Sequence, residues 1–266
     1  MTNNELSKDL EFATQLCLES GKILLDFFHQ NNFHPTRKTD RSLVTEADLA
    51  VDIFIRNSIS QSYPQDYLIS EELNPQFKNN PSVSGWIIDP LDGTTNFVLG
   101  LVHWGILITR IIDGYPVISV QYFPLLDELY QTAIGSLPTL NQRPIRVEKE
   151  GDLSTLTIFS CCSRTFRDYQ VNLRYKTRIF GSAGYSLSSV ARGVARDAFE
   201  ATAKIWDLAA AWVLIPQAGG VIGVIHGEQP FPIQNDLDYQ TKDYPVIASA
   251  SELWFNEALN KIKIKE

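Results

Sequence analysis

The pattern of apolar and polar positions divides the chain into a helical start, a run of strands and an alternating second half. Apolar residues recur at steps of three, four and seven over residues 5–28, which predicts an amphipathic helix. A second helix is expected over 45–59, with Thr45 as its N-cap and Asp48 three residues later. Short apolar stretches then indicate a mostly antiparallel sheet, at 67–70, 85–88, 104–112, 117–122 and 128–134.

Strand-like and helical segments alternate in the second half, which is typical of an α/β layer. Strands are expected at 156–160, 178–180, 198–201, 221–224 and 246–248, and helices at 164–175, 182–192, 207–217 and 252–261. Glycines and prolines over 135–152 indicate a junction between two lobes. We therefore predict an N-terminal α+β lobe over 1–148 and a C-terminal α/β lobe over 149–266.

Composition narrows the class of protein. With 44% apolar and 20% charged residues, the 266-residue chain has the make-up of a soluble globular protein. A net charge of −8 argues against a nucleic-acid partner or a membrane surface. Three cysteines without C-x-x-C spacing fit a reducing compartment, and we see neither a signal peptide nor a membrane-spanning run. We expect a cytoplasmic protein.

The chemically informative stretch is 89–97, where an apolar strand runs directly into two acids. Asp89 and Asp92 are separated by Pro90, which stiffens the turn, and are followed by Gly93, which lets another group approach the backbone. Hard carboxylate oxygens on one rigid turn suit Mg²⁺. Free N–H groups after Gly93 suit a phosphate.

Four other acidic residues have ordinary explanations when each segment is taken alone. Glu71 and Glu72 follow the strand at 67–70 and could be a solvated pair. Asp207 and Asp48 stand at helix starts, where an acid commonly serves as a cap.

Taken together, these segments resemble the inositol monophosphatase family of lithium-sensitive, Mg²⁺-dependent phosphatases. Its first signature matches residues 89–97, its second matches 206–220, and its L-V-T-x-A-D segment matches 43–48. The order and spacing agree from about residue 10 to about residue 250. The resemblance implies an α+β or α/β fold, a layered αβαβα sandwich of the inositol monophosphatase and fructose-1,6-bisphosphatase type.

The resemblance also implies residue roles. Two to three Mg²⁺ ions per subunit would be held by Glu71, Asp89, the Leu91 carbonyl, Asp92 and Asp207. Thr94, helped by Glu71, would position the attacking water, with Asp92 among the catalytic groups and Asp48 orienting the Thr94 hydroxyl. Substrate contacts are expected from Gly93, Thr94, Gly181, Ser182, Ala183, Glu200, Asp207 and Lys38, with Arg37 as an alternative to Lys38.

These roles lead to a hypothesis of function. The chain is expected to hydrolyse a phosphate monoester of a small polyol, with inositol 1-phosphate as the first choice, through a metal-activated water. Alternative substrates are fructose 1,6-bisphosphate, histidinol phosphate and 3′-phosphoadenosine 5′-phosphate. A regulatory binding protein on the same scaffold is the alternative of another class. The resemblance also implies a homodimer.

One segment, 161–178, matches the family poorly and carries a run of basic side chains. They are Arg164, Arg167, Arg174, Lys176 and Arg178. This run is either a solvated face or a site for a second substrate phosphate.

Overall fold

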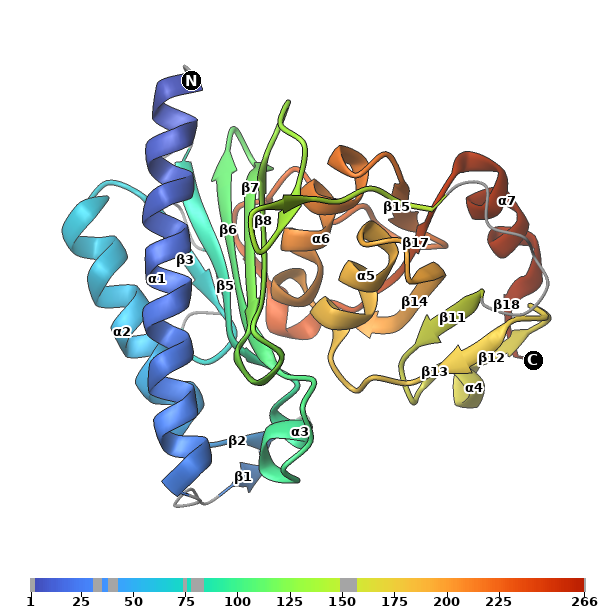
Figure 1. The fold of residues 1–266 in the computed structure, drawn as a ribbon, viewed down its shortest axis with the longest axis horizontal. Helices are drawn as coiled ribbons and strands as arrows, with labels where there is room; N and C mark the ends of the chain where they lie inside the picture. The colour runs from blue at the N-terminus through green and yellow to red at the C-terminus, as the bar shows by residue number, and fades with distance from the viewer. Residues whose placement is uncertain are drawn as a thin grey trace.

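The first two helices cover one face of the first sheet (Figure 1). In the computed structural model, which describes residues 3–30, 35–37, 43–73, 76–77, 84–148 and 157–265, they are α1 (Asn3–Gln30) and α2 (Glu46–Ser62). Their apolar stripes are buried against the strands. Thr45 caps α2 and forms the predicted capping box with Asp48. Both predicted helices are confirmed.

The first sheet has seven strands within the described residues, in the order β10-β9-β8-β7-β6-β5-β3. Only β3 and β5 pair in parallel, so the prediction of a mostly antiparallel sheet is confirmed. The strands are β3 (Tyr67–Ser70), β5 (Ser84–Asp92), β6 (Gly105–Ile112), β7 (Tyr115–Phe123), β8 (Glu128–Ala133), β9 (Thr139–Leu140) and β10 (Arg143–Pro144). The short helix α3 (Thr94–Val98) follows β5.

The second sheet has the order β13-β11-β14-β17-β15 in the part of the chain that is described. Strand β11 lies parallel to both of its neighbours, and β17 lies antiparallel to both of its own. Their bounds are β11 (Ile158–Cys161), β13 (Lys176–Arg178), β14 (Ala195–Ala203), β15 (Val221–Val224) and β17 (Tyr244–Ser249). Three short pairs complete the strands: β1 (Thr36–Arg37) with β2 (Leu43–Val44), β12 (Tyr169–Val171) with β18 (Ile262–Ile264), and β4 (Gln76–Phe77) with β16 (Leu237–Asp238).

Two apolar helices, α5 (Ala183–Ala191) and α6 (Ile205–Gln217), lie between the two sheets (Figure 1). One core cluster joins Leu107 of β6, Leu187 of α5, Leu214 of α6 and Val246 of β17. Helix α7 (Glu252–Lys261) and the four-residue α4 (Thr165–Asp168) lie on the outer side of the second sheet. The predicted layered αβαβα sandwich is therefore confirmed.

The predicted helix over 164–175 is wrong. The chain there forms only α4 and then enters β12, which pairs antiparallel with β18 near the C-terminus. The Tyr169 ring also packs edge-on against Phe199 of β14, with ring centroids 4.9 Å apart. Contacts with distant segments thus override the local helical preference.

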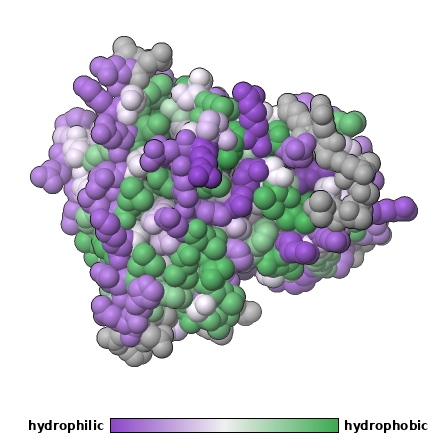
Figure 2. All heavy atoms as spheres, viewed as in Figure 1, coloured by the Kyte–Doolittle hydropathy of each residue, from purple (hydrophilic) through white to green (hydrophobic). Residues whose placement is uncertain are grey.

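Figure 2 shows the molecule from the same side as Figure 1. Hydrophobic residues gather on the visible surface near α3. Exposed apolar side chains that follow this helix are Leu99, Leu101 and Val102. Among the helices that the structure describes, none combines the length and hydropathy needed to cross a bilayer.

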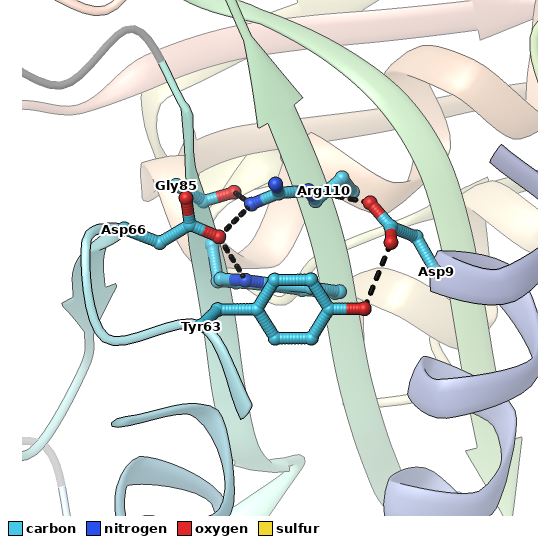
Figure 3. A network of polar contacts seen from close by, with 6 residues as sticks. Asp9, Tyr63, Asp66, Gly85 and Arg110 are labelled. Carbon is cyan, nitrogen blue, oxygen red and sulfur yellow. Dashed lines mark hydrogen bonds and ion pairs between the residues drawn. The ribbon is translucent and has the colours of Figure 1, made fainter. Parts of the chain in front are cut away.

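A buried guanidinium ties the outer helix to the first sheet (Figure 3). Arg110 of β6 donates to Asp9 of α1 at 3.0 Å, to the Gly85 carbonyl at 3.1 Å and to Asp66. Asp9 also accepts from the Tyr63 hydroxyl at 2.8 Å, and Asp66 accepts from the Trp86 indole at 3.0 Å. The Arg110 side chain is 5% exposed, so its charge is neutralised by these two carboxylates rather than by solvent.

We expect Arg110→Met to lower the free energy of unfolding by about 3–5 kcal/mol, because two buried carboxylates would lose their counter-charge. Urea unfolding followed by circular dichroism measures this change. Arg143→Met, at an exposed position in β10, is the matched control. A loss below about 1 kcal/mol, as for an exposed ion pair, would contradict the structural role of Arg110.

Candidate active site

The centre of the site is built at the end of β5. The Asp89 carboxylate accepts the backbone N–H of Leu91 at 3.0 Å, which holds the side chain over the turn at Pro90. Gly93 then adopts φ 86°, and a Cβ atom there would lie 2.8 Å from the His103 carbonyl oxygen. A glycine is therefore required at position 93, on steric and conformational grounds.

Asp92 is held by the start of α5. Its carboxylate accepts the backbone N–H groups of Ala183 and Gly184, both at 2.9 Å, and the hydroxyl of Ser182, the N-cap residue. The helix N-terminus favours a negative charge at this point. Ser182 and Ala183, predicted only as substrate contacts, thus also orient a candidate metal ligand.

Asp207 reaches the same place from the first turn of α6. Its carboxylate accepts the Lys204 backbone N–H at 2.7 Å and lies in hydrogen-bonding contact with the carboxyl group of Asp89. Asp89, Asp92 and Asp207 each offer one carboxylate oxygen, and these oxygens all lie within 4.8 Å of one another. Three carboxylates from distant positions in the chain therefore converge.

Burial and mutual repulsion disfavour the charged form of these acids. Burial, followed by the charges of Asp92 and Glu71, raises the pKa of Asp207 to about 8. Burial and the charge of Glu71 also raise the pKa of Asp92, to about 6, against the hydrogen bonds from Ser182 and α5. The pKa of Asp89 is raised well above its ordinary value by burial and then by Glu71 and Asp92.

This donor set fits a divalent cation. Two carboxyl groups in contact cannot both ionise without a counter-charge, and the described residues of the cluster contribute only hard oxygen donors. Such oxygens are the ligands that Mg²⁺ prefers. The chemistry of the cluster therefore agrees with the metal dependence of the family it resembles.

Thr94 and Asp48 form a hydroxyl–carboxylate pair beside the cluster. The Thr94 hydroxyl lies 3.1 Å from one oxygen of Asp48 and 3.0 Å from the Leu91 carbonyl oxygen. The other Asp48 oxygen accepts the N–H and hydroxyl of Thr45, at 2.8 and 2.5 Å. Asp48 is therefore both the capping-box residue of α2 and a neighbour of the site. Burial raises its pKa to about 6.

Glu71 lies in the turn after β3, which Asp52 holds in place. One oxygen of Asp52 accepts the Ser70 hydroxyl at 2.6 Å and the Leu73 N–H at 3.2 Å, on either side of Glu71. Glu71 lines the cavity over the cluster but lies outside the set of three converging ligands. Sequence reasoning missed Asp52, although its position one helical turn after Asp48 places both acids on the same face of α2.

Two adjoining cavities open over these groups. A cavity of about 330 Å³ is lined by Glu71, Asp89, Leu91, Asp92, Gly93, Thr94, Gly181 and Asp207, together with Leu43, Thr95 and Arg164. A second, of about 410 Å³, shares several of these residues and adds Ser182, Ala183 and Glu200. The structure therefore brings the predicted residues together, with Asp48 behind Thr94. Lys38 lies outside the described residues, and so does the side chain of Arg37.

Glu200 lies on β14 in the wall of the larger cavity. It is buried and accepts a hydrogen bond from the Ser186 side chain, while burial raises its pKa to about 8. Sequence reasoning missed three polar neighbours in this wall, namely Thr202, Lys204 and Gln240. Strand periodicity could not have identified Thr202 and Lys204, because the register of β14 shifts after Glu200 and Lys204 is the N-cap residue of α6.

Known proteins resemble this chain in sequence and in fold. The inositol monophosphatase family model matches residues 5–262. The histidinol-phosphatase of Chlorobaculum parvum is 33% identical over 84% of this chain and 88% of its own length. The Nus factor SuhB of Escherichia coli is 31% identical over 86% of this chain and 89% of its own length. A solved IMPase/NADP phosphatase in complex with Mg²⁺ and phosphate has the same fold, with a TM-score of 0.79 and 20% identity, over 96% of this chain and 95% of that one.

The family match and the sequence relatives, together with the fold, show a phosphatase, that is, a phosphoric monoester hydrolase. More particularly, the chain belongs to the inositol monophosphatase family, because the family model covers nearly its whole length.

In the absence of divalent metal, we expect Asp89→Asn to raise the free energy of unfolding at pH 8 by about 1–2 kcal/mol, since it removes one charge from the crowded cluster. The gain should shrink towards pH 5, where the raised pKa values leave most of these carboxyls protonated. Thermal unfolding in EDTA measures it.

With Mg²⁺ added, the wild-type protein should become more stable than Asp89→Asn. The wild-type protein should gain stability by ligand binding, and Asp89→Asn should gain little. Asp113→Asn, at an exposed turn, is the control. Equal Mg²⁺-dependent gains in wild type and Asp89→Asn would contradict a metal site at this position.

Proposed function

We propose that the chain hydrolyses phosphate monoesters of small polyhydroxylated metabolites in a Mg²⁺-dependent reaction, with inositol 1-phosphate as the representative substrate. The observation that carries the proposal is the convergence of Asp89, Asp92 and Asp207 beside a polar cavity that contains Glu200. Family membership supports the choice of inositol 1-phosphate. Residues 1–148 and 149–266 would form the two lobes that meet at the site.

Asp89, Asp92 and Asp207 would hold two to three Mg²⁺ ions per subunit, together with Glu71 and the Leu91 carbonyl. The Mg²⁺ and phosphate bound by a protein of the same fold support this assignment. When bound, Mg²⁺ would neutralise the phosphoryl charge, lower the pKa of the attacking water and stabilise the leaving oxygen.

The protein's own groups would place the reactants. Asp48 accepts the Thr94 hydroxyl hydrogen, so a lone pair of that hydroxyl is left to receive a hydrogen from the attacking water. Glu71, across the same cavity, would accept the second hydrogen of that water. The first-turn amides of α3, which have no carbonyl partner within the helix, would bind the phosphoryl oxygens.

The leaving alcohol would occupy the larger cavity. Glu200, held by Ser186, would accept hydrogen bonds from ring hydroxyls, and the loop at Gly181 and Ser182 would line the ring. Gly181 adopts φ 76°, and a Cβ there would lie 2.7 Å from the Asn96 side chain, which clamps this loop by donating to the Phe180 carbonyl at 2.8 Å.

Histidinol phosphate is a second candidate substrate, supported by the 33% identity with a histidinol-phosphatase. The name of the Escherichia coli relative, a Nus factor, keeps a regulatory binding role as the alternative of another class. The assembled carboxylate cluster favours catalysis. A homodimer, a cytoplasmic location and the lack of a nucleic-acid partner stay predictions.

The direct test is phosphate release from inositol 1-phosphate, with Mg²⁺ and with EDTA. We expect EDTA to abolish release, Li⁺ to inhibit it, and Asp89→Asn to lower kcat on the order of 10²- to 10³-fold or more while the fold is retained. Asp113→Asn again serves as the control. Turnover by Asp89→Asn close to that of wild type would exclude its proposed role.

We further expect Glu200→Gln to lower kcat/KM for inositol 1-phosphate by about 10- to 100-fold, because a charge-assisted hydrogen bond to a ring hydroxyl is weakened. The loss for p-nitrophenyl phosphate, which has no ring hydroxyls, should be much smaller. Glu252→Gln, at an exposed position in α7, is the matched control. Equal losses on both substrates would argue against ring recognition by Glu200.

A further inference from the structure

The basic segment at 164–178 contributes one side chain to the site. Arg164 lines both cavities, whereas Arg167, Arg174, Lys176 and Arg178 line neither. Arg167 is paired with Asp168 at 2.7 Å on the exposed side of α4. The fold therefore separates a single guanidinium from the rest of the basic run and places it over the substrate cavities.

The loop that carries Arg164 is fixed against β14. The backbone N–H of Cys162 donates to the Phe199 carbonyl at 3.3 Å, and the Ala201 N–H donates to the Cys162 sulfur at 3.4 Å. Arg164 itself donates from Nη1 to the Thr202 hydroxyl at 3.3 Å. Thr202 and Glu200 both belong to β14 and both line the larger cavity. Arg164 is thus held beside the wall that would contact the leaving alcohol.

The two basic side chains that line the larger cavity, Arg164 and Lys204, differ in their acidic partners. Lys204 is paired with Asp243 at 2.9 Å and donates to the Gln240 carbonyl at 2.7 Å. The Arg164 guanidinium donates to the Thr202 hydroxyl and forms no ion pair with a carboxylate in the described parts of the chain. The nearby Asp168 is paired with Arg167 instead. Glu71, Asp92 and Asp207 line both cavities and are assigned to the metal in the proposed function. Arg164 is therefore a positive group of the cavity without an ion-paired carboxylate among the described residues.

We propose that Arg164 binds a second phosphate group of the substrate, on the side of the leaving alcohol. The planar guanidinium matches the oxygens of a phosphate in a two-pronged hydrogen bond, and a phosphate supplies the missing negative charge. Among the phosphorylated polyols of the proposed function, sugar or polyol bisphosphates are accordingly preferred over monophosphates such as inositol 1-phosphate. This inference rests on the proposed phosphatase function and narrows its substrate class.

The test compares two substrates that differ only in the second phosphate, fructose 1,6-bisphosphate and fructose 1-phosphate, at fixed Mg²⁺. Release of the 1-phosphate is followed in both, with fructose 6-phosphate identified as the product of the first. We expect wild type to favour the bisphosphate in kcat/KM on the order of 10- to 100-fold, and Arg164→Gln to remove most of that preference. Arg164→Lys keeps the positive charge but cannot form the two-pronged hydrogen bond, so it should retain part of the preference for the bisphosphate.

Arg174→Gln is the matched control, because it makes the same change of charge at an exposed position outside both cavities, and it should keep the wild-type preference. The proposal would be overturned by a wild-type ratio of kcat/KM values near one, by an unchanged ratio in Arg164→Gln, or by equal losses on both substrates.

Release of phosphate from p-nitrophenyl phosphate by the same proteins tests the phosphatase function separately from the role of Arg164. Mg²⁺-dependent release without a bisphosphate preference overturns only the role of Arg164, whereas no Mg²⁺-dependent release from any substrate overturns the phosphatase function as well.

Discussion

The architecture depends on one electrostatic constraint, the burial of several carboxylates where β5 meets α6. Asp89 and Asp207 lie in contact, and burial together with nearby charges raises their pKa values. Backbone donors compensate part of this charge: α5 donates two N–H groups to Asp92, and Lys204 donates one to Asp207. A bound cation would neutralise the remaining negative charge, and its binding would then be coupled to the stability of this region.

The two central helices serve the core and the site at once. Their apolar faces pack between the sheets, and their N-termini point towards the end of β5. Because α5 holds Asp92 and α6 carries Asp207, the packing that closes the core also sets the spacing of the carboxylates. A substitution in the core of α5 or α6 would therefore change the spacing of the carboxylates without altering a candidate metal ligand.

The proposed groups for reaction and for recognition come from different sheets. The end of β5 and the start of α3 supply Asp89, Asp92 and Thr94, while β14 and the loop after β11 supply Glu200 and Arg164 to the proposed recognition wall. The recognition wall can therefore vary while the ligands stay in place. This division is consistent with relatives that share the fold but carry the names of different activities, such as histidinol-phosphatase and Nus factor.

The sequence by itself determined the local structure and the family. Periodicity and capping placed the strands over 67–70 and 221–224 and the helix over 252–261 at their observed bounds, and the motifs named the three converging acids. Only the tertiary structure decided that 169–171 forms a strand, that α5 holds Asp92, and that Arg164 alone of its basic run faces the cavities. Capping and periodicity depend on neighbours within a few residues, whereas these three features depend on contacts between segments far apart in the chain.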